Sequence, residues 1–155
     1  MIQRELYLLG SPRLEVGGEI VHIARRKTTA LLAYLAATGR RHHRDTLATL
    51  LWPDYDTSRA RANFRRTLSL VNRILGGSGI LADRETVGLN PDLDLWLDVA
   101  AFREKLAICG GHSHPPTDVC PECVTALEEA VALYEDDFLA GFTLGDSVVF
   151  DEWQL

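Results

Sequence analysis

The residues of this chain that are best suited to hold a metal lie in one short segment, CGGHSHPPTDVCPEC. Cys109 and His112 are separated by two residues, and so are Cys120 and Cys123, so that each pair fits a single tight turn. Zinc in structural sites takes four such sulfur and nitrogen ligands in a tetrahedron. We therefore predict a structural zinc site whose ligands are Cys109, His112, Cys120 and Cys123, with His114 as an alternative ligand.

Two other interpretations of this segment stay open. In one, the thiols and histidines are loosely placed at the surface, and Cys109 and Cys123 come close enough to oxidise. In the other, the segment is the centre of a metal-dependent hydrolase, which is disfavoured because no general base stands nearby in a recognisable motif. The chain also lacks a Gly-rich phosphate loop, a nucleophile elbow and a paired-carboxylate motif. We therefore expect that the protein is not an enzyme.

A second group of residues points to an anionic partner. The stretch Thr57–Leu75 reads TSRARANFRRTLSLVNRIL and contains five arginines and no carboxylate. At about 100° per residue, one face of a helix over this stretch is apolar. It is formed by Phe64, Leu68, Val71 and Leu75, with Ala60, Thr67 and Ile74 beside them. The opposite face carries Arg59, Arg61, Arg65, Arg66, Ser69, Asn72 and Arg73.

An arginine fork matches both a phosphate and the edge of a guanine. A solvated amphipathic helix is the alternative, but such helices usually mix charge signs to gain pairs between residues four apart. Five arginines without an acid repel one another, and the pattern therefore favours an anionic partner.

The elements predicted before and after this helix indicate the fold to which it belongs. Residues 4–9, 12–16 and 19–23 are predicted strands, punctuated by Gly and Pro turns. Helices are predicted over residues 25–38, ending at Gly39, over 46–52, capped by Asp45, and over 57–75, capped by Thr57 or Ser58. A hairpin over residues 80–82 and 86–89 follows, with Arg84 at its tip. Three helices followed by a hairpin are typical of a winged helix-turn-helix.

The remainder of the chain is predicted to be helical. Residues 90–97 are expected to form an acidic linker with Leu95, Trp96 and Leu97 buried against one domain. Asp98 is expected to cap a helix over residues 99–107, and a second helix covers 124–136. The two would form an antiparallel helical hairpin, with a new helix starting at about Ser147. Because the sequence ends inside that helix, we expect a fragment of a longer protein.

The net charge of −6 conceals an asymmetry along the chain. Residues 22–73 hold eleven Lys and Arg against three Asp, a net of +8, whereas residues 76–155 hold three Lys and Arg against sixteen Asp and Glu, a net of −13. A phosphate backbone would attract the first part and repel the second. The start of the chain does not have the pattern of a signal peptide, and no apolar run is long enough to span a membrane. We therefore expect a cytoplasmic protein without membrane contacts.

Several segments of the sequence resemble the SARP-type bacterial transcriptional activators. In the first part these are Leu31–Leu35, Arg44–Leu47, Leu51–Asp54 and Ala60–Arg65. In the second part they are Leu133–Tyr134, Asp137–Leu139, Gly141–Phe142 and Phe150–Trp153. The segments follow the order of that family and cover nearly the whole chain. The Cys/His segment is not part of the family's general pattern.

The resemblance implies a fold and a division into domains. The fold would be an α+β, OmpR-like winged helix-turn-helix with an N-terminal antiparallel sheet over residues 1–92. The start of an all-α bacterial transcriptional activator domain would follow over residues 93–155, as a truncated, tetratricopeptide-like helical hairpin.

The resemblance also implies partners. These are double-stranded DNA, RNA polymerase holoenzyme and a second copy bound head-to-tail on direct repeats. The polymerase contact of OmpR-like domains maps onto Pro53, Asp54, Tyr55 and Asp56.

We accordingly predict a sequence-specific transcriptional regulator, an activator, that reads the major groove with the helix over residues 57–75. The hairpin over 80–89 would contact the DNA backbone or the minor groove. Candidate contacts to base edges are Arg61, Arg65, Ser69 and Asn72. Candidate contacts to phosphates are Arg59, Arg66, Arg73, Arg84 and some of Arg25, Arg26, Lys27, Arg41 and Arg44. The alternative is a winged-helix module that binds proteins and not DNA, with the acidic half as its docking surface.

Overall fold

The computed structural model describes residues 3–112, 114–115, 118 and 120–155. The chain divides into two compact units, and each unit combines two separate segments. One consists of Met1–Ile20 and Leu95–Gly141, and the other of Val21–Asp94 and Phe142–Leu155. These units do not coincide with the predicted ranges 1–92 and 93–155, because the N-terminal strands are grouped with the helical hairpin and the C-terminal segment is grouped with the winged helix.

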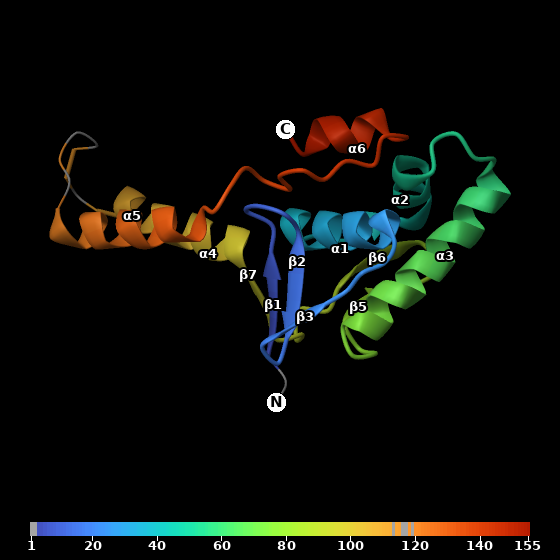
Figure 1. The fold of residues 1–155 in the computed structure, drawn as a ribbon, viewed down its shortest axis with the longest axis horizontal. Helices are drawn as coiled ribbons and strands as arrows, with labels where there is room; N and C mark the ends of the chain where they lie inside the picture. Colours follow the sequence, from blue (N-terminus) through green and yellow to red (C-terminus); the bar gives the residue numbers. More distant parts are fainter. Residues whose placement is uncertain (1–2, 113, 116–117, 119) are drawn as a thin grey trace. The chain divides into compact units, whose positions relative to one another are not determined.

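The first unit contains a four-stranded sheet in the order β3-β2-β1-β7. Its strands are β1 (Arg4–Tyr7), β2 (Arg13–Val16), β3 (Glu19–Val21) and β7 (Leu95–Leu97). The three N-terminal strands confirm the prediction. Figure 1 shows β1 beside β2. In β1, Leu6 stands opposite Leu14 of the antiparallel β2 and opposite Leu97 of the parallel β7. Residues 95–97, the end of the expected linker, therefore form β7, an edge strand of this sheet. All three residues of β7 are half-buried.

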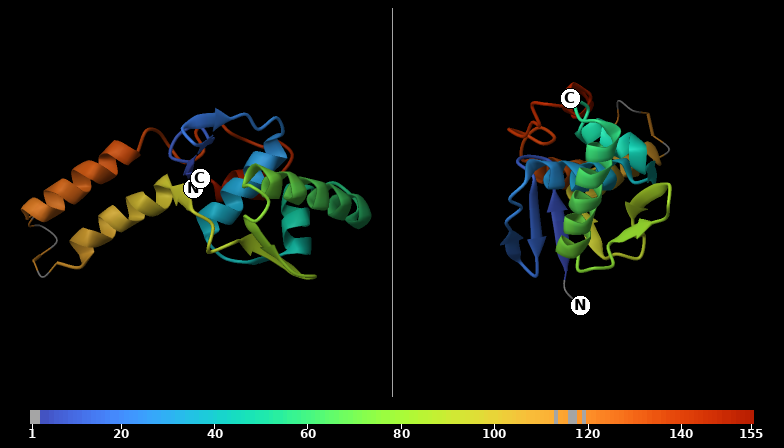
Figure 2. Two further views of the ribbon diagram at one scale, coloured as in Figure 1. Left: turned by 90° about the horizontal axis from the view of Figure 1, so that it is seen from below. Right: turned by 90° about the vertical axis from the view of Figure 1, so that its right-hand side faces the viewer.

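Two antiparallel helices, α4 (Asp98–Gly110) and α5 (Pro121–Leu133), lie side by side in this unit (Figure 2). The hairpin confirms the prediction, although α5 begins three residues earlier than expected. Asp98 is the first residue of α4, and the N-cap is Leu97 rather than Asp98 as predicted. The Asp98 carboxylate turns instead to the end of β1 and accepts hydrogen bonds from the backbone N–H of Leu8 at 2.9 Å and of Leu9 at 2.8 Å.

The second unit follows the predicted order of helices and hairpin. Its elements are α1 (Arg26–Thr38), β4 (His42–His43), α2 (Arg44–Leu51), α3 (Thr57–Ile74), β5 (Ile80–Ala82), β6 (Thr86–Leu89) and α6 (Val148–Trp153). Gly39 ends α1 in the left-handed conformation, with φ of 64°, as predicted. The strands form a sheet in the order β4-β6-β5. Three helices followed by this small sheet make a winged helix-turn-helix.

The core of the second unit receives one large side chain from each helix. Leu31 of α1, Leu47 of α2, Phe64 of α3 and Phe150 of α6 are all fully buried. Burial of a side chain of this size stabilises a fold by about 1.5–3 kcal/mol. The helix α6 starts beside Ser147, as predicted. Ser147 is its N-cap, because the Ser147 hydroxyl oxygen accepts a hydrogen bond from the Phe150 N–H at 3.3 Å.

None of the helices in the described part of the chain is both long enough and apolar enough to cross a membrane.

Candidate functional site

The arginine helix α3 begins and ends at residues that favour those positions. Asp56 is its N-cap, and the Asp56 carboxylate accepts a hydrogen bond from the Arg59 N–H at 2.9 Å. The predicted caps Thr57 and Ser58 lie inside the helix instead, because the carboxylate one residue earlier satisfies the free N–H of the first turn. At the other end, Gly76 has φ of 92°, a conformation that favours glycine.

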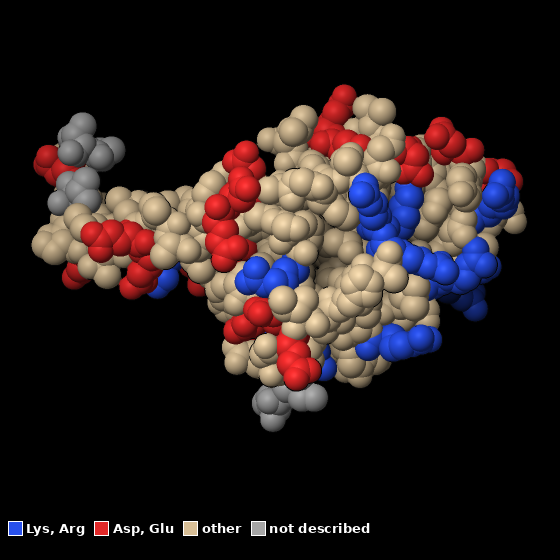
Figure 3. Space-filling model, viewed as in Figure 1, with Lys and Arg blue, Asp and Glu red and all other residues tan. Residues whose placement is uncertain are grey.

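The two faces of α3 are those that the periodicity predicted. Every residue of the predicted apolar face is buried except Ile74, which is half-buried. On the opposite face, Arg59, Arg61, Arg65, Arg66, Ser69 and Arg73 are exposed. Figure 3 shows Lys and Arg side chains gathered over the part of the molecule that contains α3.

One arginine of this face has an acidic partner from another helix. Arg61 donates from Nε and Nη2 to the two carboxylate oxygens of Asp45, each at 2.9 Å. Asp45 was predicted to cap α2, but α2 begins at Arg44 with His43 as its N-cap, so Asp45 lies in the first turn and faces α3. The hydrogen bond from Arg61 holds the pKa of the Asp45 carboxyl below its usual range. Asp45 therefore fixes the Arg61 fork in one orientation.

Two hollows flank α3, and both contain predicted DNA contacts. The first, of about 750 Å³, is lined by residues of α2, α3 and the hairpin turn, among them Arg44, Arg61, Arg65 and Arg84. The second, of about 560 Å³, lies between α3 and the start of α1. It is lined by Arg25, Arg66, Ser69 and Arg73 among others. The structure thus brings residues that are far apart in the sequence to both sides of one helix.

The hairpin turn is held by a carboxylate. Asp83 Oδ1 accepts hydrogen bonds from the N–H of Thr86 at 2.7 Å and of Glu85 at 2.8 Å, and the first of these is the main reason why the Asp83 pKa is lowered. Arg44 donates from Nε to the Asp83 carbonyl oxygen at 2.8 Å, so the start of α2 holds the turn in place. Arg84 remains exposed at the tip, as predicted.

Asn72, one of the predicted base contacts, has internal hydrogen-bond partners. Its Nδ2 donates to the Gly77 carbonyl at 3.1 Å, and its Oδ1 accepts from the Ile80 N–H at 3.2 Å. Both ends of the amide are therefore used to join α3 to β5. Helical periodicity could not predict these contacts, because it places Asn72 on the exposed face but carries no information about the path of the chain after Gly77.

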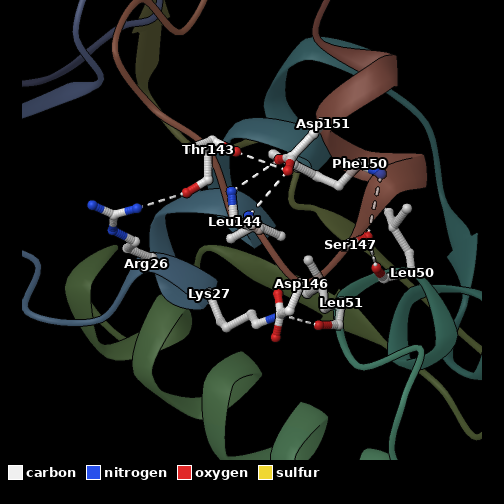
Figure 4. Close-up of polar contacts among 11 residues, drawn as sticks. Arg26, Lys27, Leu50, Leu51, Thr143, Leu144, Asp146, Ser147, Phe150 and Asp151 are labelled. Carbon is white, nitrogen blue, oxygen red and sulfur yellow. Dashed lines mark hydrogen bonds and ion pairs between the residues drawn. The ribbon is translucent and has the colours of Figure 1, made fainter.

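Two of the cations at the start of α1 also have internal partners (Figure 4). Arg26 donates from Nη1 to the Thr143 carbonyl at 2.9 Å. Lys27 forms an ion pair with Asp146 at 2.6 Å and also donates to the Leu51 carbonyl. The unfavourable placement of cations at a helix N-terminus is thus offset in part by the C-terminal segment 142–155. Arg25 is exposed, and no ion pair or side-chain hydrogen bond to it is found within the described residues.

The loop between α2 and α3 presents the residues that were predicted to contact RNA polymerase. Pro53, Asp54, Tyr55 and Asp56 are all exposed. The Arg59 guanidinium lies 4.6 Å from the centre of the Tyr55 ring, a cation–π contact that connects this loop to α3.

The Cys/His segment belongs to the first unit, and four of its five candidate ligands converge. The ligand atoms of His112, His114, Cys120 and Cys123 all lie within 4.8 Å of one another. Cys109 is not part of this group, although its side chain also interacts with the Cys123 thiol and its Sγ contacts the Cys123 carbonyl at 3.7 Å. The group of converging residues therefore contains His114, the predicted alternative ligand, in place of Cys109, which belonged to the preferred ligand set.

The two thiols of this cluster have opposite pKa shifts. The Cys123 N–H donates to Cys120 Sγ at 3.4 Å, and it is the main reason why the pKa of Cys120 is lowered to about 6. Burial is the main reason why the pKa of Cys123 is raised to about 12.

The fold and the cationic helix define a winged helix-turn-helix protein with an additional sheet and helical hairpin. No protein-family model and no curated protein matches the chain. Among solved structures, the chain is similar to Mycobacterium tuberculosis EmbR in complex with a low-affinity phosphopeptide. The TM-score is 0.75 and the identity 22%, over 99% of this chain and 41% of that chain. The likeness shows a shared fold, and this chain spans less than half the length of the EmbR chain.

Proposed function

We propose that this chain is a sequence-specific DNA-binding regulator of transcription, and that it acts as an activator. The observation that carries the proposal is the exposed face of α3, on which five arginines stand without an acid from the same helix. The flanking hollows add Arg25 on one side and Arg44 and Arg84 on the other. The segments that resemble SARP-type activators and the fold shared with EmbR support the same conclusion.

In this proposal α3 enters the major groove. Arg61, Arg65 and Ser69 contact base edges, and the ion pair with Asp45 sets the orientation from which Arg61 reaches its base. Phosphates are contacted by Arg59, Arg66, Arg73, Arg84 and Arg25. Arg26 and Lys27 are not included among these contacts, because their side chains bind the segment 142–155.

The loop Pro53–Asp56 is proposed as the contact to RNA polymerase, because all four of its residues are exposed beside α3. Two copies are proposed to bind head-to-tail on direct repeats. If the loop has this role, Tyr55→Ala lowers transcription from a target promoter in vitro by much more than it lowers DNA affinity, which changes only through the loss of the contact between Tyr55 and Arg59. Equal losses of affinity and of transcription would assign Tyr55 to DNA binding instead.

The test of the central proposal starts with selection of bound duplexes from a random-sequence pool. Fluorescence anisotropy then gives the affinity of each variant for a selected duplex and for a random duplex. Arg65→Ala is expected to weaken binding to the selected duplex by about 1–3 kcal/mol, or roughly 5- to 150-fold. Binding to the random duplex is expected to fall much less. Arg25→Ala is expected to weaken both equally and to reduce the salt slope by about one unit.

Arg103→Ala is the matched control, because it removes the same charge from an exposed position on α4 in the other unit. It is expected to bind both duplexes like the wild-type protein. Equal loss on both duplexes from Arg65→Ala would contradict the base contact. Failure of the wild-type chain to bind any duplex at moderate salt would favour the alternative, a winged-helix module that binds proteins.

A further inference from the structure

The loop between α4 and α5 brings two histidines and two cysteines together around one point. His112 Nδ1 lies 3.3 Å from His114 Nε2, 3.1 Å from Cys120 Sγ and 3.1 Å from Cys123 Sγ. His114 Nε2 lies 3.1 Å from Cys123 Sγ. The cluster belongs to the first unit of the chain, whereas the proposed DNA contacts belong to the second.

Hydrogen bonds within the cluster cannot account for this arrangement. An imidazole nitrogen offers either one hydrogen or one lone pair, whereas His112 Nδ1 has three polar atoms within 3.3 Å. A single cation at the centre would satisfy all four atoms at once. Zinc binds nitrogen at about 2.0–2.1 Å and sulfur at about 2.3 Å. These bond lengths place the ligand atoms of a tetrahedron roughly 3.3–3.8 Å apart. Four of the separations are 3.1–3.3 Å, slightly shorter than or at the lower end of that range, and all ligand atoms lie within 4.8 Å of one another.

The other nitrogen of each imidazole has a partner suited to a metal-bound histidine. His114 Nδ1 lies 3.1 Å from the Pro115 carbonyl oxygen, which leaves Nε2 for the cluster. His112 Nε2 lies 3.5 Å from a carboxylate oxygen of Glu122, which leaves Nδ1 for the cluster. Histidines that bind metals usually donate their second N–H to a carbonyl or carboxylate, which fixes the tautomer and the ring orientation.

The two cysteines lie at the start of α5, on a turn that is held by the backbone. Cys120 is the N-cap, and Pro121 occupies the first helical position, where it needs no hydrogen-bond acceptor. The Cys123 N–H donates to Cys120 Sγ at 3.4 Å, so that both sulfurs stand on one side of the turn. Cys123 is buried with 1% of its surface exposed, and the other three ligands are half-buried.

We propose that His112, His114, Cys120 and Cys123 bind one structural zinc ion that ties the end of α4 to the start of α5. Four protein ligands leave no open position for a water or a substrate, which favours a structural role over a catalytic one. Two thiolates would neutralise the ion. Cys109 is not a ligand, although its spacing to His112 predicted that it would be.

The proposal is tested on the whole chain, purified under reducing conditions, by metal analysis and by titration with Co²⁺. The wild-type protein is expected to contain one zinc per chain. With Co²⁺ it is expected to show the strong visible absorption of a tetrahedral site together with the charge-transfer bands of two thiolates. His114→Ala and Cys123→Ser are expected to lose most of the zinc and to lower the Co²⁺ affinity by at least tenfold.

Cys109→Ser is the matched control, because it removes a thiol that touches Cys123 but does not belong to the four converging ligands. It is expected to keep one zinc and an unchanged Co²⁺ spectrum. Far-UV circular dichroism of each variant, with and without added Zn²⁺, separates loss of the site from failure to fold. A zinc content near zero in freshly reduced wild-type protein would overturn the proposal. Loss of zinc from Cys109→Ser together with its retention in His114→Ala would overturn this ligand set.

Discussion

Asp98 carries the only carboxylate that is buried within the described part of the chain, with 1% of its surface exposed. It joins the start of α4 to the end of β1, because its oxygens accept from the N–H of Leu8 and of Leu9. Both of these residues are buried as well. Replacing Asp98 by alanine therefore leaves the N–H groups of Leu8 and Leu9 without their acceptor in a place that water reaches poorly, and it also removes the contact of the carboxylate with the Val99 N–H at 2.8 Å.

The size of the effect follows from these two groups. A buried donor that loses its partner costs about 1–3 kcal/mol, so Asp98→Ala is expected to lower the free energy of unfolding by about 2–6 kcal/mol. Asp98→Asn keeps one acceptor oxygen and is expected to lose roughly half as much. Asp94→Ala, which removes an exposed carboxylate four residues earlier, is expected to stay within about 0.5 kcal/mol of the wild-type value.

Urea unfolding followed by circular dichroism measures the loss of stability, and amide hydrogen exchange locates it. A loss of about 4 kcal/mol corresponds to roughly a thousandfold faster exchange at Leu8 and Leu9. The expected order of stability is Asp94→Ala, then Asp98→Asn, then Asp98→Ala. A loss below about 1 kcal/mol for Asp98→Ala would refute the reasoning, because it would mean that the two N–H groups do not depend on this carboxylate.

Three further predictions concern the winged helix. Phe64→Ala removes the largest buried side chain of α3 and is expected to cost about 3–5 kcal/mol in thermal or urea unfolding; a loss under about 1 kcal/mol would contradict the burial of that face. Asp45→Asn removes the acid that neutralises Arg61 and is expected to steepen the salt slope of binding to a random duplex by about one unit. An unchanged salt slope would contradict the position of Arg61 and Asp45 at the DNA interface. Because the folded pKa of Asp83 is depressed, its contribution to the hairpin is complete above its unfolded pKa of about 3.8 and is lost as the pH falls through the lower folded value. The Thr86 amide shift should follow that titration, and it should not titrate in Asp83→Asn.

The sequence by itself determined the features that depend on neighbours along the chain. Helical periodicity separated the buried face of α3, around Phe64, from its arginine face, and the structure confirms both faces. Local signals also placed Gly39 at the end of α1 and the hairpin around Arg84. Such features are predictable because their causes, the helical repeat and the conformational freedom of glycine, act within a few residues.

Only the tertiary structure decided which side chains meet across the fold. In the folded chain, Arg61 donates to Asp45, and Asn72 accepts a hydrogen bond from the start of β5. Lys27 forms an ion pair with Asp146, which lies far away in the sequence. The fold also brings His114 into the cysteine cluster. Spacing along the chain favoured Cys109 as a ligand, but ligand choice depends on where the loop directs each side chain. Such contacts depend on the path of loops and on packing between distant elements, which local residue patterns do not specify.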